Sequence, residues 1–256
     1  GGERIAGWSE QPDVTGSFLA PEGEGPHPAV VLMHGCGGLQ PAVLQGLGRH
    51  AAFLRDEGFA TLIVDSLGPR LKNGDRVCAS HEELAAARYY RLGDAFAAAA
   101  HLAAKPEVDA ENIFLIGQSN GGSVALTAAR HARNRRPDGT PVFAGTVAYY
   151  PWCGVMGLSN LSPVLVLHAE EDDWVSPREC VSKAERADPS AAPAEVVVYP
   201  GVHHSFDLDV PFQRYSGRIV EGNAAATRRS RRRYLAFLRE HLRRADGTRT
   251  ALESLR

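Results

Sequence analysis

Short apolar runs alternate with longer amphipathic or alanine-rich runs along most of this chain. The runs that predict strands are Val30–Met33, Phe59–Asp65, Asn112–Gly117, Val142–Tyr150, Val164–His168 and Glu195–Tyr199. The runs that predict helices are Leu44–Glu57, Glu82–Ala104, Ser119–Arg133, Pro177–Ala187 and Arg228–Arg244. Strands that are apolar at successive positions are typical of a sheet covered on both faces. The alternation of strand and helix therefore predicts an α/β fold with a mostly parallel central sheet and helices on both sides.

The pattern predicts one domain over residues 1–256. The earlier segment Val14–Ala20 is expected to add an antiparallel edge strand. No internal repeat or low-complexity linker divides the chain, and the polar stretches Asn134–Pro141 and Asp188–Pro193 are short enough to be loops. We expect a core of about residues 14–244 followed by a frayed tail at 245–256.

Composition and charge limit the kinds of molecule that we expect this protein to bind. Hydrophobic residues make up 44% of the chain and charged residues 23%, a balance that argues against disorder. The net charge of −2 provides no field to attract nucleic acid, and no apolar run reaches the roughly 20 residues of a membrane span. Arg228–Arg244 contains eight arginines, but Leu235, Leu238 and Leu242 recur at helical spacing, so the arginines are expected on a solvated face. We expect no nucleic-acid or membrane partner.

The four cysteines, Cys36, Cys78, Cys153 and Cys180, have no zinc-site spacing, and we expect no metal or cofactor. An even number permits disulfides in an exported protein and free thiols in a cytoplasmic one. Since Cys153 and Cys180 follow neighbouring predicted strands, we hypothesise a disulfide between them. The first residues carry no apolar signal segment, which fits a cytoplasmic protein or an exported mature form equally well.

The sharpest chemical signal is Gly117-Gln118-Ser119-Asn120-Gly121-Gly122, between a predicted strand and a predicted helix. This is the G-x-S-x-G pattern of a nucleophile elbow in its expected context. Ser119 would stand on a strained turn, and small neighbours two residues away would let the backbone pass closely. A serine hydroxyl needs a base to become a nucleophile, and that base needs an acid to orient it.

Two later segments are placed to supply the base and the acid. In an open α/β sheet, ligands bind beyond the carboxyl ends of the strands. His168–Val175 follows one predicted strand and offers four carboxylates, while Tyr199–Phe206 follows the next and offers His203 and His204. Their order suits a serine, acid, histidine arrangement. The residues alone do not choose among these carboxylates and histidines.

A glycine-rich turn, Met33-His34-Gly35-Cys36-Gly37-Gly38, follows the first predicted buried strand. A backbone N–H from such a turn can stabilise a developing oxyanion together with the N–H of the residue after the nucleophile. We expect the amides of Cys36 and Asn120 to serve in this way. A phosphate-binding turn is disfavoured because the G-x-G-x-x-G spacing is absent.

From about Pro28 to Leu242 the chain resembles the dienelactone hydrolase family of α/β-hydrolases. The resemblance rests on His34–Gly38, Asp65–Arg70, Gly117–Gly122, Asp172–Pro177 and Tyr199–Asp207. It implies the α/β-hydrolase fold without a large lid. In that family the acid lies three residues before a valine, as Asp172 does, and the histidine precedes a small residue and phenylalanine, as His204 does. The resemblance therefore implies a triad of Ser119, Asp172 and His204.

The chain also departs from the family pattern. The enzymes that give the family its name use a cysteine nucleophile where Ser119 stands, and they carry an acid in the oxyanion turn where Gly35 stands. They hold a substrate carboxylate with two arginines; Arg70 lies near one of these positions, and Leu208 occupies the other. These differences favour a serine esterase that acts on a different ester.

We predict that the protein hydrolyses a small carboxylic ester, as a monomer or small homo-oligomer without a cofactor. Arg70, Trp152, Trp174 and Phe206 fall near predicted strand ends and are candidate substrate contacts. Taken one at a time, packing in the core or at the rim is the favoured interpretation for the three aromatic residues, and a solvated or structural role is the favoured interpretation for Arg70. Hydrolysis of a lactone or peptide by the same residues is an alternative. A second alternative is a non-catalytic binding protein, because a fold by itself does not establish activity.

Overall fold

The computed structural model describes residues 2–8, 11–74, 76–130, 139–154, 158 and 160–243. The predicted tail, residues 245–256, and the end of the predicted helix Ser119–Arg133 lie outside the described residues. Within these ranges, no helix combines the length and the apolar character that crossing a bilayer requires.

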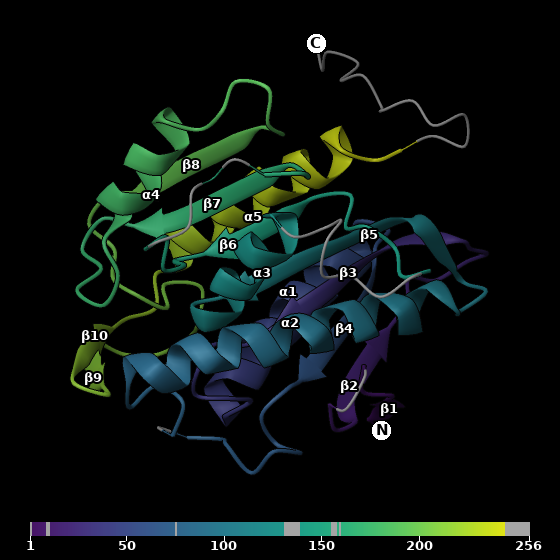
Figure 1. The fold of residues 1–256 in the computed structure, drawn as a ribbon, viewed down its shortest axis with the longest axis horizontal. Coiled ribbons are helices and arrows are strands. Elements are labelled where there is room, and N and C mark those ends of the chain that lie inside the picture. The colour runs from purple at the N-terminus through teal and green to yellow at the C-terminus, as the bar shows by residue number, and fades with distance from the viewer. Residues whose placement is uncertain are drawn as a thin grey trace.

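Eight strands form one sheet in the order β1-β2-β4-β3-β5-β6-β7-β8 (Figure 1). They are β1 (Glu3–Ile5), β2 (Val14–Leu19), β3 (His27–Met33), β4 (Ala60–Asp65), β5 (Val108–Gln118), β6 (Thr146–Tyr149), β7 (Val164–Ala169) and β8 (Ala194–Tyr199). The strands from β3 to β8 run parallel, while β2 pairs antiparallel with β4 and with β1. The predicted α/β class with a mostly parallel sheet is confirmed.

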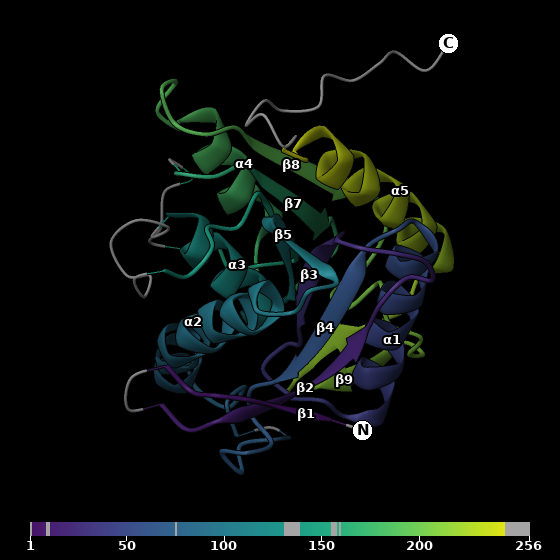
Figure 2. The same cartoon turned by 90° about the vertical axis from the view of Figure 1, so that its right-hand side faces the viewer.

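Helices cover both faces of the sheet. They are α1 (Pro41–Asp56), α2 (His81–Ala103), α3 (Asn120–Arg130), α4 (Pro177–Glu185) and α5 (Ala224–Glu240). Figure 2 shows α2, α3 and α4 on one face and α1 and α5 on the other. The start of α2 follows directly from its sequence, because the Ser80 side chain accepts a hydrogen bond from the Glu83 N–H in the manner of an N-cap.

The central strands are buried on both sides, which explains their continuous apolar sequence. Along β3, Val31 and Met33 pack into the layer that includes residues of α2 and α3, whereas Val30 and Leu32 pack into the layer that includes residues of α1 and α5. All four side chains are fully buried. Since neighbouring residues of a strand face opposite sides, a sheet with two helical layers needs apolar residues at every position.

Two features were not expected from the sequence. The segment β2 is antiparallel as predicted, but it is not the edge strand, because the short β1 pairs with its outer side. A small hairpin of β9 (Gln213–Tyr215) and β10 (Arg218–Val220) follows β8 and forms a separate two-stranded sheet. A hydrogen bond from the Glu221 N–H to the His204 carbonyl links the end of this hairpin to the loop after β8.

Candidate active site

Ser119 occupies a sharp turn between β5 and α3. Its φ angle is +52°, a left-handed conformation that is strained for a side chain other than glycine. A Cβ added to Gly117 would lie 2.0 Å from the Gly121 carbonyl oxygen, and one added to Gly121 would lie 2.5 Å from the carbonyl oxygen of His34. The two glycines of the motif are therefore required because the backbone segments approach too closely for any side chain.

The tertiary structure brings Ser119, His204 and Asp172 together from three separate loops. His204 Nε2 lies 3.0 Å from Ser119 Oγ, and His204 Nδ1 lies 2.7 Å from Asp172 Oδ2. A carboxylate only accepts hydrogen bonds, so Nδ1 carries the proton and Nε2 is free to accept the proton of Ser119. The imidazole is flanked by Tyr150 and Trp174, whose ring centroids lie 4.4 and 5.0 Å from its own.

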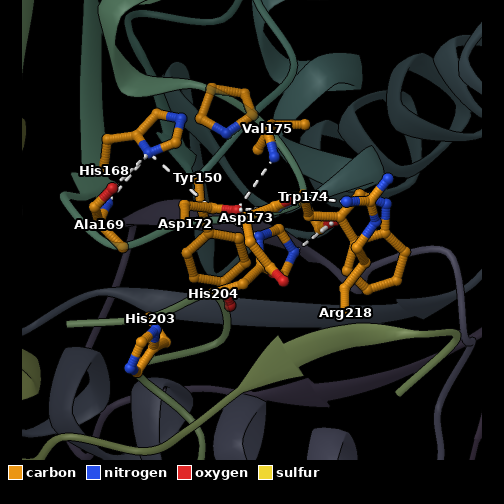
Figure 3. Close-up of polar contacts among 12 residues, drawn as sticks. Tyr150, His168, Ala169, Asp172, Asp173, Trp174, Val175, His203, His204 and Arg218 are labelled. Atoms are coloured by element: carbon orange, nitrogen blue, oxygen red, sulfur yellow. Dashed lines mark hydrogen bonds and ion pairs between the residues drawn. The ribbon is translucent and has the colours of Figure 1, made fainter. Parts of the chain in front are cut away.

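The carboxylate of Asp172 is fully buried yet well supplied with hydrogen bonds (Figure 3). Its Oδ1 accepts the backbone N–H groups of Trp174 at 2.9 Å and Val175 at 3.0 Å. Burial by itself would raise the pKa of Asp172, but the charge and hydrogen bond of His204 and the Val175 N–H outweigh it and lower the pKa below its ordinary value. Asp172 is therefore ionised at neutral pH and able to orient His204.

His203 and Asp173, which the residues alone left as possible base and acid, form contacts with other parts of the structure. Figure 3 shows His203 pointing away from the cluster formed by Asp172, Trp174 and His204. Its Nδ1 donates to the Glu171 carbonyl oxygen at 3.0 Å. Asp173 anchors the hairpin, because its carboxylate accepts the Ile219 N–H and its carbonyl oxygen accepts Arg218 Nη1. The geometry thus separates groups that the residues alone left equivalent.

Two backbone N–H groups beside Ser119 are available to a ligand. Within the described part of the chain, the amides of Cys36 and Asn120 donate to no protein acceptor. The turn that carries Cys36 passes close to the nucleophile, since a Cβ added to Gly35 would lie 3.4 Å from Ser119 Cβ. Unpaired amides at the start of a helix and in a glycine-rich turn can hold an oxyanion.

Ser119 and Cys36 lie on the walls of two cavities. The first, which we call the His204 cavity, has a volume of about 200 Å³ and is also lined by His204, Val43, Leu208, Trp174 and Tyr215. The second, which we call the α2 cavity, has a volume of about 150 Å³ and is also lined by Leu84, Arg88, Asn120 and Trp152. No group of three metal-ligating side chains occurs among the residues that the structure describes.

The candidate substrate contacts divide into two groups. Trp174 lines both cavities and Trp152 lines the α2 cavity. Phe206 does not fit its predicted role, because it is fully buried in the core against Tyr149, Tyr150 and Tyr199.

The prediction that Arg70 contacts substrate is also wrong in this structure. Its guanidinium forms two hydrogen bonds of 2.9 Å with the buried carboxylate of Asp94, and it lines neither cavity. The anion clamp of two arginines that the resemblance raised is therefore absent: Arg70 is paired within the protein, and Leu208 stands on an apolar cavity wall.

A buried polar network behind the site was missed at the sequence level. Asp207 is fully buried, and its carboxylate accepts hydrogen bonds from His50, Gln118 and Tyr150. Gln118 precedes Ser119 and Tyr150 packs on His204, so this network joins the two loops behind the candidate nucleophile and base. The only local signal is that Asp207 lies three residues after His204, which does not reveal partners far away in the chain.

Two disulfides cross-link segments near the site. The hypothesised Cys153–Cys180 bond is present, and a second bond joins Cys36 to Cys78, which the sequence did not pair. The Cys36 bond links the glycine-rich turn to the segment before α2 and closes a loop with a sequence separation of 42 residues. A cross-link of this kind restricts the unfolded chain and holds the turn in place.

We expect the double variant Cys36→Ser/Cys78→Ser to lower the free energy of unfolding by about 2–4 kcal/mol, mainly because the unfolded chain gains entropy. Urea unfolding of the oxidised protein and the variant measures this difference. Dithiothreitol should destabilise the wild type and leave a variant that lacks all four cysteines unchanged. Equal stability of oxidised wild type and double variant would contradict the prediction.

The buried side chain of His168 is expected to make the stability of the folded protein depend on pH. Its side chain is fully buried 3.9 Å from Asp172, and burial lowers its pKa from 6.5 to about 4. Between these values the unfolded chain binds the proton and the folded protein does not, so stability falls as pH decreases from about 6.5 to about 4. The full loss is on the order of 3 kcal/mol.

Urea unfolding at a series of pH values between 7.5 and 4 measures this loss. The matched variant His168→Asn retains an acceptor for the Ala169 N–H, which bonds His168 Nδ1 at 3.0 Å, but it does not titrate. Its stability should fall less steeply over the same range. Parallel curves for the two proteins would rule out His168 as the source of the dependence.

Comparisons with known proteins agree with this architecture. The model of the dienelactone hydrolase family matches residues 14–242. A candidate dienelactone hydrolase from Klebsiella pneumoniae subsp. pneumoniae MGH 78578 superposes with a TM-score of 0.70 and 21% identity, covering 93% of this chain and 97% of its own. The dienelactone hydrolase-like promiscuous phosphotriesterase P91 from metagenomic libraries gives 0.68 and 22%, with 93% and 97% coverage. The propionate-bound esterase 2 of Thermogutta terrifontis gives 0.67 and 17%, with 93% of each chain covered. No curated protein matches the chain.

Proposed function

The chain belongs to the dienelactone hydrolase family and is thus a hydrolase that acts on esters, and from this premise we propose that it cleaves carboxylic esters through an acyl-enzyme on Ser119. The observation that carries the proposal is the chain of two hydrogen bonds from Ser119 Oγ through His204 to Asp172. Such a chain converts a serine hydroxyl into a nucleophile near neutral pH.

In the first half of the proposed reaction, His204 Nε2 accepts the proton of Ser119 while Oγ attacks the ester carbonyl carbon. Asp172 stabilises the imidazolium that forms. The negative charge on the former carbonyl oxygen is held by the amides of Cys36 and Asn120, each worth about 3–4 kcal/mol of barrier. The tetrahedral intermediate then expels the alcohol oxygen, which takes the proton from His204 Nε2.

In the second half, water enters beside His204 and gives a proton to Nε2 as its oxygen attacks the acyl carbon. A second tetrahedral intermediate forms, with its charge held by the same two amides. Its collapse releases the carboxylic acid and returns the proton to Ser119 Oγ, which restores the starting state.

The two cavities suggest how an ester would lie. The leaving alcohol oxygen must receive its proton from His204 Nε2, so the alcohol belongs in the His204 cavity, whose wall includes His204. The acyl group then extends into the α2 cavity, whose wall also includes Ser119. Leu208, Val43 and Trp174 make the alcohol side apolar, which favours an uncharged alcohol group.

The descriptions of two structural relatives support the proposal that Ser119 is an activated nucleophile. P91 is described as a promiscuous phosphotriesterase, and structures of the Thermogutta terrifontis esterase 2 are described as phosphorylated by paraoxon and phosphonylated by sarin. Activated organophosphorus compounds mimic the tetrahedral intermediate of ester hydrolysis and trap an activated nucleophile. By analogy, we propose that Ser119 of this chain is open to the same trapping.

We expect a fluorophosphonate probe to add one phosphonyl group per molecule at Ser119, with loss of fluoride, and to abolish ester turnover in parallel. Intact-protein mass spectrometry followed by peptide mapping measures the stoichiometry and the site. A non-catalytic binding protein would not react. Modification at another residue, or full labelling with turnover retained, would contradict the proposal.

A further inference from the structure

Helix α2 buries an arginine directly behind the candidate site. Arg91 has no exposed surface, and burial lowers its pKa to about 10, so it remains charged at neutral pH. Its neighbour Asp94 is held by two hydrogen bonds from Arg70. Arg91 forms no ion pair with any carboxylate in the described part of the chain. The charges of Asp94 and Asp65 attract this buried cation, but neither carboxylate forms a hydrogen bond with it. Burying a charge without a hydrogen-bonded counterion is costly, and its retention suggests a specific task.

The hydrogen bonds of Arg91 indicate that task. Nη1 donates to Asn120 Oδ1 at 2.7 Å, and Nη2 donates to the carbonyl oxygen of His34 at 2.5 Å. His34 lies in the glycine-rich turn that carries the Cys36 amide, and Asn120 carries the second amide next to Ser119. One planar guanidinium therefore joins the two segments from which both candidate oxyanion donors come.

Neighbouring contacts make this link rigid. The Asn120 side chain also donates to the carbonyl oxygen of Leu84 on α2, at 3.0 Å. His34 Nε2 accepts the Ser66 N–H at 3.2 Å, so Nδ1 carries the proton and donates to the Gly35 carbonyl oxygen at 2.7 Å. The start of α3 is thus attached to α2, the turn is attached to the segment after β4, and Arg91 joins the two.

We propose that Arg91 is a positioning residue for the oxyanion hole, which sets the separation and direction of the Cys36 and Asn120 amides. This inference rests on the proposed function. A guanidinium suits the role because its donors are fixed in one plane, whereas the lysine ammonium is a point charge on a flexible stem. An oxyanion hole stabilises charge only when its donors are already aimed at the position of the oxyanion.

The test compares Arg91→Met and Arg91→Lys with wild type, using burst titration to count active sites. We expect kcat per active site to fall about 10²-fold in Arg91→Met and about 10-fold in Arg91→Lys, with KM within about twofold. A trifluoromethyl ketone, which Ser119 converts to a tetrahedral oxyanion, should lose affinity in proportion to kcat/KM. The matched methyl ketone, which stays trigonal, should bind unchanged.

The matched control is the double variant Arg70→Met/Asp94→Asn, which removes a buried ion pair between the loop after β4 and helix α2, outside both cavities. It should lower the melting temperature yet keep kcat within about threefold. If Arg91 were only a packing residue, its variants would behave like this control. Unchanged kcat and unchanged trifluoromethyl ketone affinity in folded Arg91→Met would overturn the proposal.

Two further measurements separate failure of the positioning role from misfolding of the variant and from failure of the proposed function. If Arg91→Met does not fold, a double-mutant cycle of Arg91→Lys with Asn120→Ala replaces it; the losses in kcat should then be non-additive, and additive losses would count against the inference. A Ser119→Ala variant that retained activity would refute the proposed function itself. An essential Ser119 combined with an indifferent Arg91 would refute only the positioning role.

Discussion

Replacing Ser119 with alanine is expected to lower kcat/KM for a short-chain aryl ester by about 10⁴- to 10⁶-fold. The reason is that the proposed acyl-enzyme requires an oxygen nucleophile at this position, and His204 has no other hydroxyl within hydrogen-bond distance in the described residues. Initial rates from purified proteins, with the active-site concentration of wild type titrated by a fluorophosphonate, measure the effect.

The fold should tolerate this change. Alanine removes only the hydroxyl, and the strained backbone at φ +52° is imposed by the surrounding turn. An unchanged melting temperature would therefore separate loss of chemistry from loss of structure. Ser190→Ala, at an exposed serine in the loop before β8, is the matched control and should keep full activity. Turnover by Ser119→Ala within tenfold of wild type would refute the assignment of the nucleophile.

The adjacent histidines should behave in opposite ways. His204→Ala is expected to lower kcat by about 10⁴-fold or more, because Ser119 loses the base and the leaving alcohol loses its acid. His203→Ala should keep kcat within about threefold, since His203 contacts the Glu171 carbonyl oxygen and lies 3.8 Å from Glu221, on the far side of the loop. Stopped-flow measurement of the burst of released alcohol distinguishes the two directly.

Because the two residues are neighbours, each variant controls for disturbance of the loop caused by the other. Loss of the burst in both variants would mean that the loop has collapsed, and melting temperatures would reveal it. A normal burst in His204→Ala together with a lost burst in His203→Ala would reverse the assignment and contradict the observed geometry.

Local sequence correctly indicated most strands and helices, but by itself it did not identify which candidate side chains form the site. Buried strands and amphipathic helices are recognisable because each is governed by its own periodicity of apolar residues. The hairpin β9–β10 was missed because its strands contain three residues each and little apolar sequence. The Cys36–Cys78 bond was missed because pairing depends on where two distant loops meet, which spacing along the chain does not encode.

Arg70 and Phe206 illustrate the same limit at the site. Both lie near strand ends, as substrate contacts often do, but one is paired with Asp94 and the other is packed among tyrosines. The direction of a side chain at the end of a strand depends on the backbone of its loop and on the neighbours that the loop meets. Neither is readable from residue type.

The sequence by itself determined the alternation of strands and helices, the parallel sheet, and the elbow at Ser119, because these depend on apolar periodicity and on glycines at fixed spacing. The family resemblance pointed to His204 and Asp172, but only the tertiary structure shows these side chains in contact with Ser119 and with each other. Only the tertiary structure shows that Arg91 reaches both His34 and Asn120. Those contacts join residues far apart in the chain, and their geometry arises only when the whole sheet has brought its loops to one edge.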